Sequence, residues 1–538
     1  MASVGWRRFC RTSVALLLAR TCTFCPQIMQ AEGAAARVFA GPFDAKGGAR
    51  LRVLSWNVAA VNNNPFEYWI THPSPLYKQL MQSVEDFIVR PGDEDVRVDQ
   101  VFTDAMFRQL LEKMRTHMKG IGASDLETVS RMWESEYRGR RVVSEFLRDG
   151  VIGKKRLASM PDRVSNTIQL SSGELAFRPT VINCYKGEIV SLDDWFKKWL
   201  VFFFEGGVDL DGKGPRPVHS LLQKIKQAKY PAITTEEEAV SIPLQLVLQG
   251  IFDAILVNLM QSKGGTSWQS LRREICESLN SRKNSRLMEI LQTTYSDADV
   301  VFLQEAGNQL VDELRQKYSG THTLVVPAKY NPKRNQNSVM LVRNAVISSP
   351  QEVEIPADGW DAGDLLVVKA RMADADVILA SFHGDTNGLL TVPVIHRVAQ
   401  HYPSEPLVFG LDANTYERES SSTAHVLEFE RVYKALGFKS CWGAVDPSRY
   451  TTFNARTYLQ PQLNKAAKSN ELAEKGDRNP KDFVLFSKHF EVVTVWRDNT
   501  GHGEYLEETV FPTLEFPSDH AALSSDLIFF SSGERGEL

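Results

Sequence analysis

The chain has 538 residues, of which 43% are hydrophobic and 24% are charged, and its net charge is −4. These values are those of an ordinary globular protein, and the length predicts two or three modules. They exclude a global basic field that would attract nucleic acid or membranes, so a site for a polyanion must be local.

The N-terminal 30 residues are rich in arginine and contain no acid, because the first acid is Glu32. Their apolar run, Val14 to Ala19, is far shorter than the roughly 20 apolar residues of a membrane span, so we expect no integral membrane segment. This composition suits a secretory signal or a mitochondrial or plastid transit peptide, and we favour the transit peptide. Residues 1–50 are therefore expected to be a targeting leader and linker.

The six cysteines are widely spaced: Cys10, Cys22 and Cys25 lie in the leader, and Cys184, Cys276 and Cys441 lie far apart in the rest of the chain. This spacing predicts neither a disulfide framework nor a zinc site.

A buried strand is predicted over residues 51–60, which are apolar and rich in β-branched side chains. The pattern then becomes helical. Apolar residues recur at helical spacing at Phe102, Met106, Leu110, Met114 and Met118, and at Val240, Leu244, Leu248, Ile251, Ile255 and Leu259. Further helices are expected near 126–148, 192–204 and 267–294. Residues 62–279 are thus predicted to be mostly α-helical.

Short apolar strands return after residue 297 and alternate with helices expected near 306–317, 392–401 and 425–436. The strands begin at Val300, His322, Ser338, Asp364, Asp376, Pro406, Asp482 and Ala521. Many short strands with few helices predict packed sheets flanked by helices, an α/β layered sandwich.

Polar side chains lie at the ends of these strands. They are Asn57, Glu305, His383, Asp412, Asn414, Asp482, Asp519 and His520. Each one alone is explained as a strand-end cap, but six such strand ends indicate a site held on rigid elements. Phosphoester hydrolysis needs oxygen ligands for Mg²⁺, a base that activates water, and cations or imidazoles that hold the developing charge. This set supplies all three.

Six motifs follow one another along the chain: Ser55-Trp56-Asn57, Leu303-Gln304-Glu305, Ser381-Phe382-His383-Gly384, Gly410-Leu411-Asp412-Ala413-Asn414, Lys481-Asp482-Phe483 and Ser518-Asp519-His520. In this order they resemble the endonuclease/exonuclease/phosphatase superfamily, which has the deoxyribonuclease-I-like fold. The resemblance implies a four-layer α/β sandwich of two mixed β-sheets flanked by helices. We assign residues 51–61 and 280–530 to this discontinuous catalytic domain, and 62–279 to a large helical insertion after the first catalytic strand.

The resemblance also implies a metal-dependent phosphoester hydrolase that uses Mg²⁺, with Mn²⁺ as an alternative. By resemblance Glu305 would bind the metal, with Asn57 and Asp519 nearby as further ligands or polar orienters.

The remaining motif residues would carry the acid–base chemistry. By resemblance Asp412 would activate the attacking water, assisted by Asn414. His383 and His520 would contact the scissile phosphate, and Asp482 would hold His520 in its tautomer.

Two local basic stretches suggest what the substrate is. Residues 314–351 contain no acid, and residues 449–481 contain seven Lys or Arg against three acids, with aromatic residues between them. Basic side chains neutralise phosphates and aromatic rings stack on bases, which favours flexible nucleic acid, although solvated loops explain the charge equally well. The residues expected to bind substrate are Arg334, Asn337, Arg449 and Tyr458.

Three functions therefore stay open. The leading one is a nuclease or other phosphodiesterase, and the second is an inositol-phosphate phosphatase or a sphingomyelinase. Residues 478–483 lack the Trp-Cys-Asp-Arg signature that inositol 5-phosphatases carry there. The third is an inactive scaffold that binds partners through the insertion. The oligomeric state is not predicted.

The insertion begins with a polar and aromatic segment, residues 62–69, directly after the strand that bears Asn57. The active-site edge of an α/β sheet lies at such strand ends, so we expect this segment to line the cleft. The competing interpretation is that Phe66, Tyr68 and Trp69 only anchor the insertion to the sandwich core.

Overall fold

A computed structural model describes residues 48–332, 334–356, 359–461 and 476–531. The predicted leader lies almost wholly in residues 1–47, outside the described residues. The chain divides into two compact units, Met1–Pro42 and Phe43–Leu538, and everything below concerns the second unit.

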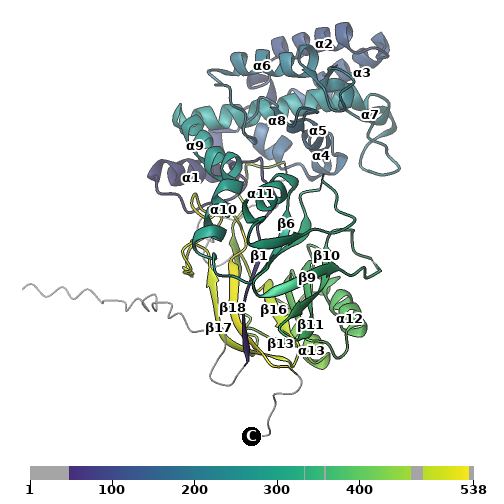
Figure 1. Cartoon of the computed structure of the whole chain (residues 1–538). Coiled ribbons are helices and arrows are strands. Elements are labelled where there is room, and N and C mark those ends of the chain that lie inside the picture. The colour runs from purple at the N-terminus through teal and green to yellow at the C-terminus, as the bar shows by residue number, and fades with distance from the viewer. Residues whose placement is uncertain (1–47, 333, 357–358, 462–475, 532–538) are drawn as a thin grey trace, which may run out of the picture. The chain divides into compact units, whose positions relative to one another are not determined.

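The first sheet has six strands in the order β17-β18-β1-β6-β8-β7 (Figure 1). Their bounds are β1 Ala49–Asn57, β6 Val300–Ala306, β7 His322–Val325, β8 Asn337–Arg343, β17 Phe490–Asp498 and β18 Ala522–Phe529. The central strand β1 pairs in parallel with β6 and antiparallel with β18, so the sheet is mixed. The strand predicted over residues 51–60 therefore begins two residues earlier and ends at Asn57.

The second sheet also has six strands, in the order β13-β16-β12-β11-β10-β9. Their bounds are β9 Ile347–Glu352, β10 Leu365–Met372, β11 Ala375–His383, β12 Leu407–Asp412, β13 Lys439–Ser440 and β16 Asp482–Phe486. Strand β12 pairs in parallel with β11 and antiparallel with β16.

The two sheets pack face to face because side chains alternate along each strand. In β1, Leu51 and Val53 belong to the core between the sheets, whereas Leu54 and Trp56 face the helical side. At Gly410 in β12 an added Cβ would lie 2.4 Å from the ring of Phe302 in β6, so only glycine allows this close approach.

Helices cover the outer faces of both sheets. Helices α10 (Lys283–Thr293) and α11 (Asn308–Tyr318) pack on the first sheet, and α12 (Thr391–His401) and α13 (Val426–Ala435) pack on the second. The result is the four-layer α/β sandwich expected from the sequence.

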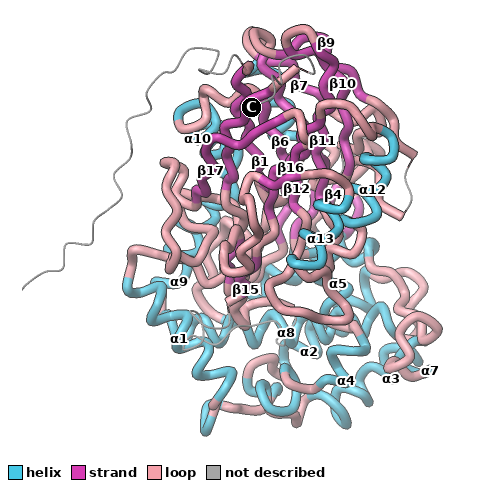
Figure 2. Tube along the Cα trace, turned by 90° about the horizontal axis from the view of Figure 1, so that it is seen from below, coloured by secondary structure: helices cyan, strands magenta, loops and turns pink. Residues whose placement is uncertain are grey.

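Helices also dominate the region between β1 and β6, which Figure 2 shows in cyan beside the magenta strands. Their bounds are α1 Pro75–Val89, α2 Asp104–His117, α3 Ala123–Met132, α4 Gly150–Lys155, α5 Ser159–Ser165, α6 Leu192–Leu200, α7 Thr235–Ala239, α8 Ser241–Gly264 and α9 Ser267–Cys276. The small two-stranded sheets are β2 Thr167–Gln169 with β3 Leu175–Phe177, β4 Gly207–Val208 with β5 Arg216–Pro217, and β14 Thr452–Asn454 with β15 Asp477–Asn479.

Two of the predicted helices are interrupted. The helix expected over 126–148 is α3 followed by π-helical turns over Trp133–Tyr137 and Val142–Leu147. The helix expected over 267–294 is two helices, α9 and α10, separated by a π-helical segment over Glu277–Ser281 and by Arg282. Apolar spacing continues through both breaks, and spacing alone therefore did not reveal them.

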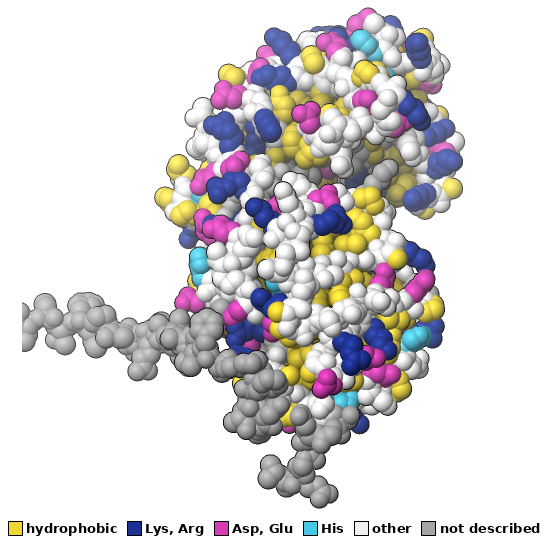
Figure 3. Space-filling model, in the orientation of Figure 1, with side chains coloured by type: hydrophobic (Ala, Val, Ile, Leu, Met, Phe, Trp, Pro, Cys, Tyr) yellow, Lys and Arg dark blue, Asp and Glu magenta, His cyan; other side chains and the backbone are white. Residues whose placement is uncertain are grey.

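Helix α8 is the centre of the helical region. By length and composition alone it could cross a membrane, but 89% of its most apolar window is buried inside the structure. A helix that is apolar all round is typical of such a buried core position. Over the face seen in Figure 3, basic and acidic side chains are interspersed, in keeping with the small net charge.

One disulfide joins residues that the sequence spacing did not pair. Cys184 and Cys276 are bonded across 92 residues, with Cα atoms 5.6 Å apart. The spacing of the cysteines in the sequence did not reveal this pair. Two cysteines so distant in sequence give no local signal, because their proximity depends on how α9 packs against the rest of the insertion.

Candidate functional site

Polar strand ends from both sheets meet at one edge of the sandwich. In the first sheet Asn57 pairs in register with Gln304, the neighbour of Glu305. In the second sheet His383 pairs with Asp412, which in turn pairs with Asp482. Because the two sheets pack face to face, these residues converge.

Glu305 lies at an irregularity of its strand. The register of β6 against β8 shifts between Leu303 and Ala306, and Glu305 has a left-handed φ of 57°. Bulges of this kind re-aim a side chain and often occur beside active sites, and a non-glycine residue in this region is strained. The local backbone is thus shaped around the Glu305 carboxylate.

The Glu305 carboxylate is held by three donors. Asn57 Nδ2 donates to Oε1 at 3.1 Å, the amide of Ala60 donates to Oε2 at 2.7 Å, and His383 Nε2 lies 3.2 Å from Oε1. Burial by itself raises the pKa of Glu305, but the hydrogen bonds and charge of His383 and the bond from Asn57 outweigh it and hold the pKa far below the usual range. Glu305 is therefore an anion at neutral pH.

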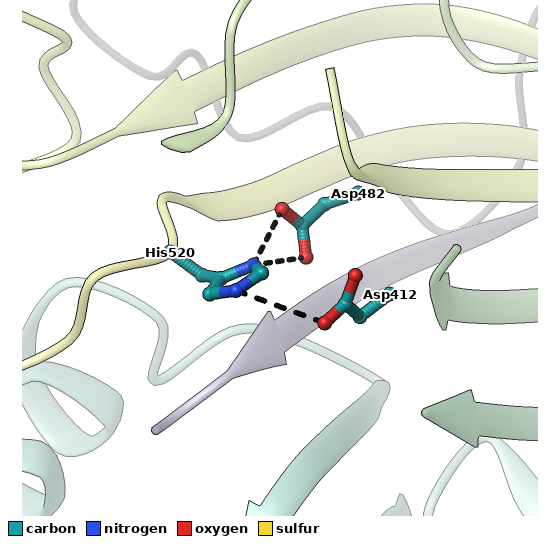
Figure 4. A group of neighbouring side chains, drawn as sticks. All are labelled: Asp412, Asp482 and His520. Atoms are coloured by element: carbon teal, nitrogen blue, oxygen red, sulfur yellow. Dashed lines mark hydrogen bonds and ion pairs between the residues drawn. The ribbon is translucent and has the colours of Figure 1, made fainter. Parts of the chain in front are cut away.

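Asp412, Asp482 and His520 form a second cluster (Figure 4). His520 Nδ1 lies 3.0 Å from Asp482 Oδ2, and His520 Nε2 lies 3.7 Å from Asp412 Oδ2. Burial lowers the pKa of His520, but the charges of Asp482 and Asp412 reverse this and raise it to about 10. The imidazole is thus a cation at neutral pH, with Nε2–H directed towards Asp412.

Asn57 links the two clusters. Its Nδ2 also donates to Asp412 Oδ2 at 2.9 Å, and Asp412 is fully buried. The backbone amide of Asn414 donates to Asp412 Oδ1 at 2.9 Å. Lys481 in turn donates from Nζ to Asn414 Oδ1 at 3.0 Å, a contact that its place in the Lys-Asp-Phe motif did not reveal.

Most of these residues line a cavity of about 640 Å³. The predicted site residues in its lining are Glu305, Arg334, His383, Asp412, Asn414, Asp519 and His520. Asn57 and Asp482 are not among the lining residues; each is fully buried and hydrogen-bonded to residues that are.

The start of the insertion forms part of the same cavity wall. Asn62, Asn64, Pro65, Glu67 and Tyr68 line it, so the expectation that residues 62–69 reach the cleft is confirmed.

The wall at Tyr68 is tied to a later segment of the sandwich. Arg456 lies over the ring of Tyr68 at 5.6 Å and pairs with Glu67 at 3.2 Å. Phe66 and Trp69 are buried in the core, so they serve as the anchors and Tyr68 as the lining residue. Burial, followed by the charge of Asp519, raises the pKa of Tyr68 well above its usual value.

The four residues expected to bind substrate are not placed together. Arg334 lines the cavity, whereas Asn337 is buried behind it and donates from Nδ2 to the Arg334 carbonyl at 2.7 Å. Arg449 lies over the ring of Trp442, and Tyr458 lines a different cavity. Of the four, the described structure therefore brings only Arg334 to this cavity.

Lys283 is a cavity residue that the sequence analysis missed. It begins α10, is 4% exposed, and donates from Nζ to the Pro517 carbonyl at 2.7 Å. Burial lowers its pKa to about 8, although the charges of Asp519 and Glu305 act in the opposite direction. Its position at the start of the helix that leads into β6 was the only available signal.

Two groups of side chains could hold a metal ion. Ligand atoms of Asp412, Asp482 and His520 lie within 4.8 Å of one another, but His520 already uses Nδ1 with Asp482 and carries a proton. Glu305 and Asp519 offer carboxylate oxygens, the donors that Mg²⁺ and Mn²⁺ take, while the amide oxygen of Asn57 also accepts from the amide of Ala59 at 2.9 Å. The donor chemistry therefore fits the second group better.

Comparison with solved structures finds several of similar fold. D. rerio TDP2 complexed with a single-strand DNA product is 15% identical, with 46% of this chain and 92% of that chain covered and a TM-score of 0.33. The human Nocturnin catalytic domain with bound sulfate is 15% identical, with coverages of 48% and 89% and a TM-score of 0.33. ANGEL2, a 2′,3′-cyclic phosphatase, is 14% identical, with coverages of 46% and 85% and a TM-score of 0.32. Structural similarity at these identities and TM-scores does not identify a substrate for this chain.

Comparison with family models divides the chain in two. Residues 95–273 match a domain of unknown function, and residues 276–520 match the Endonuclease/Exonuclease/phosphatase family. No curated protein matches the chain. The second match spans the strands that bear Glu305, His383, Asp412 and Asp482, and it ends at His520. The match over residues 276–520 agrees with the resemblance to the endonuclease/exonuclease/phosphatase family that the sequence motifs indicated.

Proposed function

We propose that the protein is a divalent-metal-dependent phosphodiesterase that activates water at Asp412. The observation that carries this proposal is the separation of 3.7 Å between His520 Nε2 and Asp412 Oδ2 in the cavity. It is too long for a direct hydrogen bond and suits one bridging oxygen, from a water or a phosphate. A donor and an acceptor thus face the same small space.

In the proposed reaction Asp412 accepts a proton from the water while the water oxygen bonds to phosphorus. The phosphorus–oxygen bond to the leaving group breaks, and that oxygen keeps the electron pair. His520, protonated and held by Asp482, donates a hydrogen bond to the phosphate oxygens as their charge grows. His383 contributes in the same way from the opposite sheet, and Asn414 orients Asp412 through its backbone amide.

Glu305 and Asn57, with Asp519 nearby, would hold Mg²⁺ or Mn²⁺. The bound ion would neutralise charge on the phosphate oxygens. Glu305 suits this role because its low pKa keeps it anionic.

Four cationic side chains can contact phosphate groups from the lining, which also holds seven acids. Lys283, Arg334, Arg456 and Lys481 all line the cavity. We propose a nucleic-acid strand, with Arg334 as a substrate contact. The same cations in a space of about 640 Å³ also suit a compact phosphate ester such as an inositol phosphate, which is the second candidate.

The test is hydrolysis by the purified full chain with Mg²⁺ of single-stranded and duplex DNA, RNA, inositol phosphates and sphingomyelin. We expect cleavage of a nucleic acid, loss of activity in EDTA, and a fall of about 10³-fold or more in Glu305→Gln. Glu127→Gln, an exposed carboxylate on α3, is the matched control and should keep full activity. Turnover in EDTA would exclude the metal role, and inactivity on every substrate would favour the scaffold alternative.

Two assignments from the sequence are part of this proposal. We propose that residues 51–61 and 280–530 form the catalytic domain around the insertion 62–279. We also propose that residues 1–50 direct the protein to an organelle; a fluorescent protein fused behind them should then leave the cytosol without entering the secretory pathway.

A further inference from the structure

A second cavity, of about 980 Å³, lies in the helical region and shares no lining residue with the cavity of His520. Its walls include Phe146, Ile152 of α4, Phe252 of α8, and Tyr230. Tyr458 from the sandwich part of the chain completes the wall. Most of this lining is apolar, and the proposed reaction does not use it.

Basic side chains line the same cavity. They are Arg148, Lys154, Arg156 and Lys229. The one acid in the lining, Asp149, is already engaged, because Oδ2 pairs with Arg140 at 2.7 Å and Oδ1 accepts from the amide of Val151 at 2.7 Å. The cavity therefore carries an excess of positive charge.

Three of these cations lack an anionic partner. No carboxylate of the described residues lies within ion-pair distance of Lys154, Arg156 or Lys229, whereas Arg148 donates to the carbonyl of Val89 at 2.8 Å. Lys154 and Lys229 are exposed, and the Lys229 ammonium lies over the ring of Tyr230 at 5.7 Å, so both charges stand at the opening of the cavity. An apolar interior beside unpaired cations is complementary to a ligand with an apolar body and an anionic head.

We propose that this cavity binds a single-chain anionic amphiphile, with the acyl chain inside and a carboxylate or phosphate head among Lys154, Arg156 and Lys229. A nucleotide or sugar would leave polar atoms without partners against Phe146, Ile152 and Phe252, which is costly. A bilayer surface is also disfavoured, because membrane-binding helices present a protruding apolar face, whereas these side chains line a hollow. The ligand is therefore a free amphiphile that enters the hollow.

The first experiment measures binding to the full chain by calorimetry below the critical micelle concentration. The probes are oleate and oleoyl lysophosphatidate, with oleyl alcohol as the uncharged analogue and phosphatidylglycerol vesicles as the membrane arm. We expect saturable binding of one molecule of each acid, and binding of the alcohol weaker by about tenfold, which corresponds to ~1.4 kcal/mol.

The second experiment uses variants that separate the two halves of the site. An added Cβ at Gly153 meets nothing within 4 Å, so Gly153→Trp is expected to fold and to occlude the cavity, weakening both acids and the alcohol by tenfold or more. Ala158→Trp is a second variant that should occlude the cavity, because Ala158 lines it directly before α5. The pair Lys154→Glu and Lys229→Glu should weaken only the acids. Lys119→Glu, an exposed lysine of the insertion outside this cavity, is the matched control.

Thermal unfolding of each variant verifies that it is folded. The proposal is overturned if the alcohol binds as tightly as the acids, if binding requires vesicles, or if the folded occluding variants bind like the wild type. Saturable, head-dependent binding that the occluding variants abolish supports it. Since these measurements need no hydrolysis, they stand apart from the test of the proposed function.

Discussion

His520 and Asp482 form a buried pair in which Nδ1 of the imidazole lies 3.0 Å from Oδ2 of the carboxylate. Asp482 is fully buried and does not line the cavity, so it acts on the reaction only through His520. The backbone of His520 is held separately, since Trp56 donates from Nε1 to its carbonyl at 3.0 Å. The orientation of the ring and its charge therefore depend on Asp482, while its place in the fold does not.

Asp482→Asn should lower kcat by a factor of about 10²–10⁴, the usual contribution of a positioned acid–base group, with little change in KM. The amide keeps the shape but no longer holds the imidazolium. Steady-state kinetics and thermal unfolding measure the two effects. Asp86→Asn, on the exposed face of α1, is the control. A change in KM alone would contradict the positioning role.

Asp412→Asn and His520→Ala should have effects that are far from additive, because both serve one transition state across a separation of 3.7 Å. The double variant is expected to be about as slow as the slower single variant. Single-turnover rates of the four proteins in the cycle give the coupling. If the rate of the double variant falls by the product of the two single-variant factors, the residues act in separate steps.

At the start of the insertion, substitution of Tyr68 should change substrate specificity, whereas substitution of Phe66 should change stability. Tyr68 lines the cavity, so Tyr68→Ala should change the ratio of kcat/KM between a nucleic acid and an inositol phosphate. Phe66 is fully buried, so Phe66→Ala should cost about 3–5 kcal/mol of unfolding free energy without changing that ratio. If Tyr68→Ala lowers stability as much as Phe66→Ala and leaves the substrate preference unchanged, Tyr68 only anchors the insertion.

The Cys184–Cys276 bond should stabilise the insertion, because it closes a long loop in the unfolded chain. Replacement of both cysteines by alanine is expected to lower the free energy of unfolding by about 2–4 kcal/mol. Urea unfolding with and without dithiothreitol measures this. The wild type should respond to the reductant and the double variant should not, whereas a wild type indifferent to reductant would mean that the bond contributes nothing.

Asp526 should contribute an acid-sensitive part of the stability. Burial raises its pKa, but hydrogen bonds and charge from Arg52 and Arg50 outweigh this and lower it. A lowered carboxyl pKa means that the stabilisation is present above the ordinary value and is lost as the pH falls through the lowered one. Asp526→Asn should thus be less stable by about 2–3 kcal/mol at pH 7, since Arg50 loses its carboxylate partner and Arg52 keeps only Asp297, and the deficit should vanish in strong acid. Denaturant unfolding of both proteins from neutral pH to strong acid tests this prediction. A difference in unfolding free energy that stays constant with pH would show that the charge of Asp526 does not stabilise the fold.

The layered sandwich and the set of polar strand ends could be predicted from the sequence. A mostly apolar run such as residues 51–57 indicates burial of both strand faces, and a polar residue at its end marks the rim. Glu305, His383, Asp412 and His520 were predicted in this way, and the structure gathers them in one cavity.

Tertiary structure alone decided which other residues reach that cavity. Lys283 and the Cys184–Cys276 pair line it although no local pattern marks them, whereas Arg449 and Tyr458, which lie in a promising basic stretch, point elsewhere. The physical reason is that periodicity records how each segment meets the core, while the direction of a loop side chain depends on contacts with segments hundreds of residues away. Those contacts arise only when the helical region packs beside the end of β1.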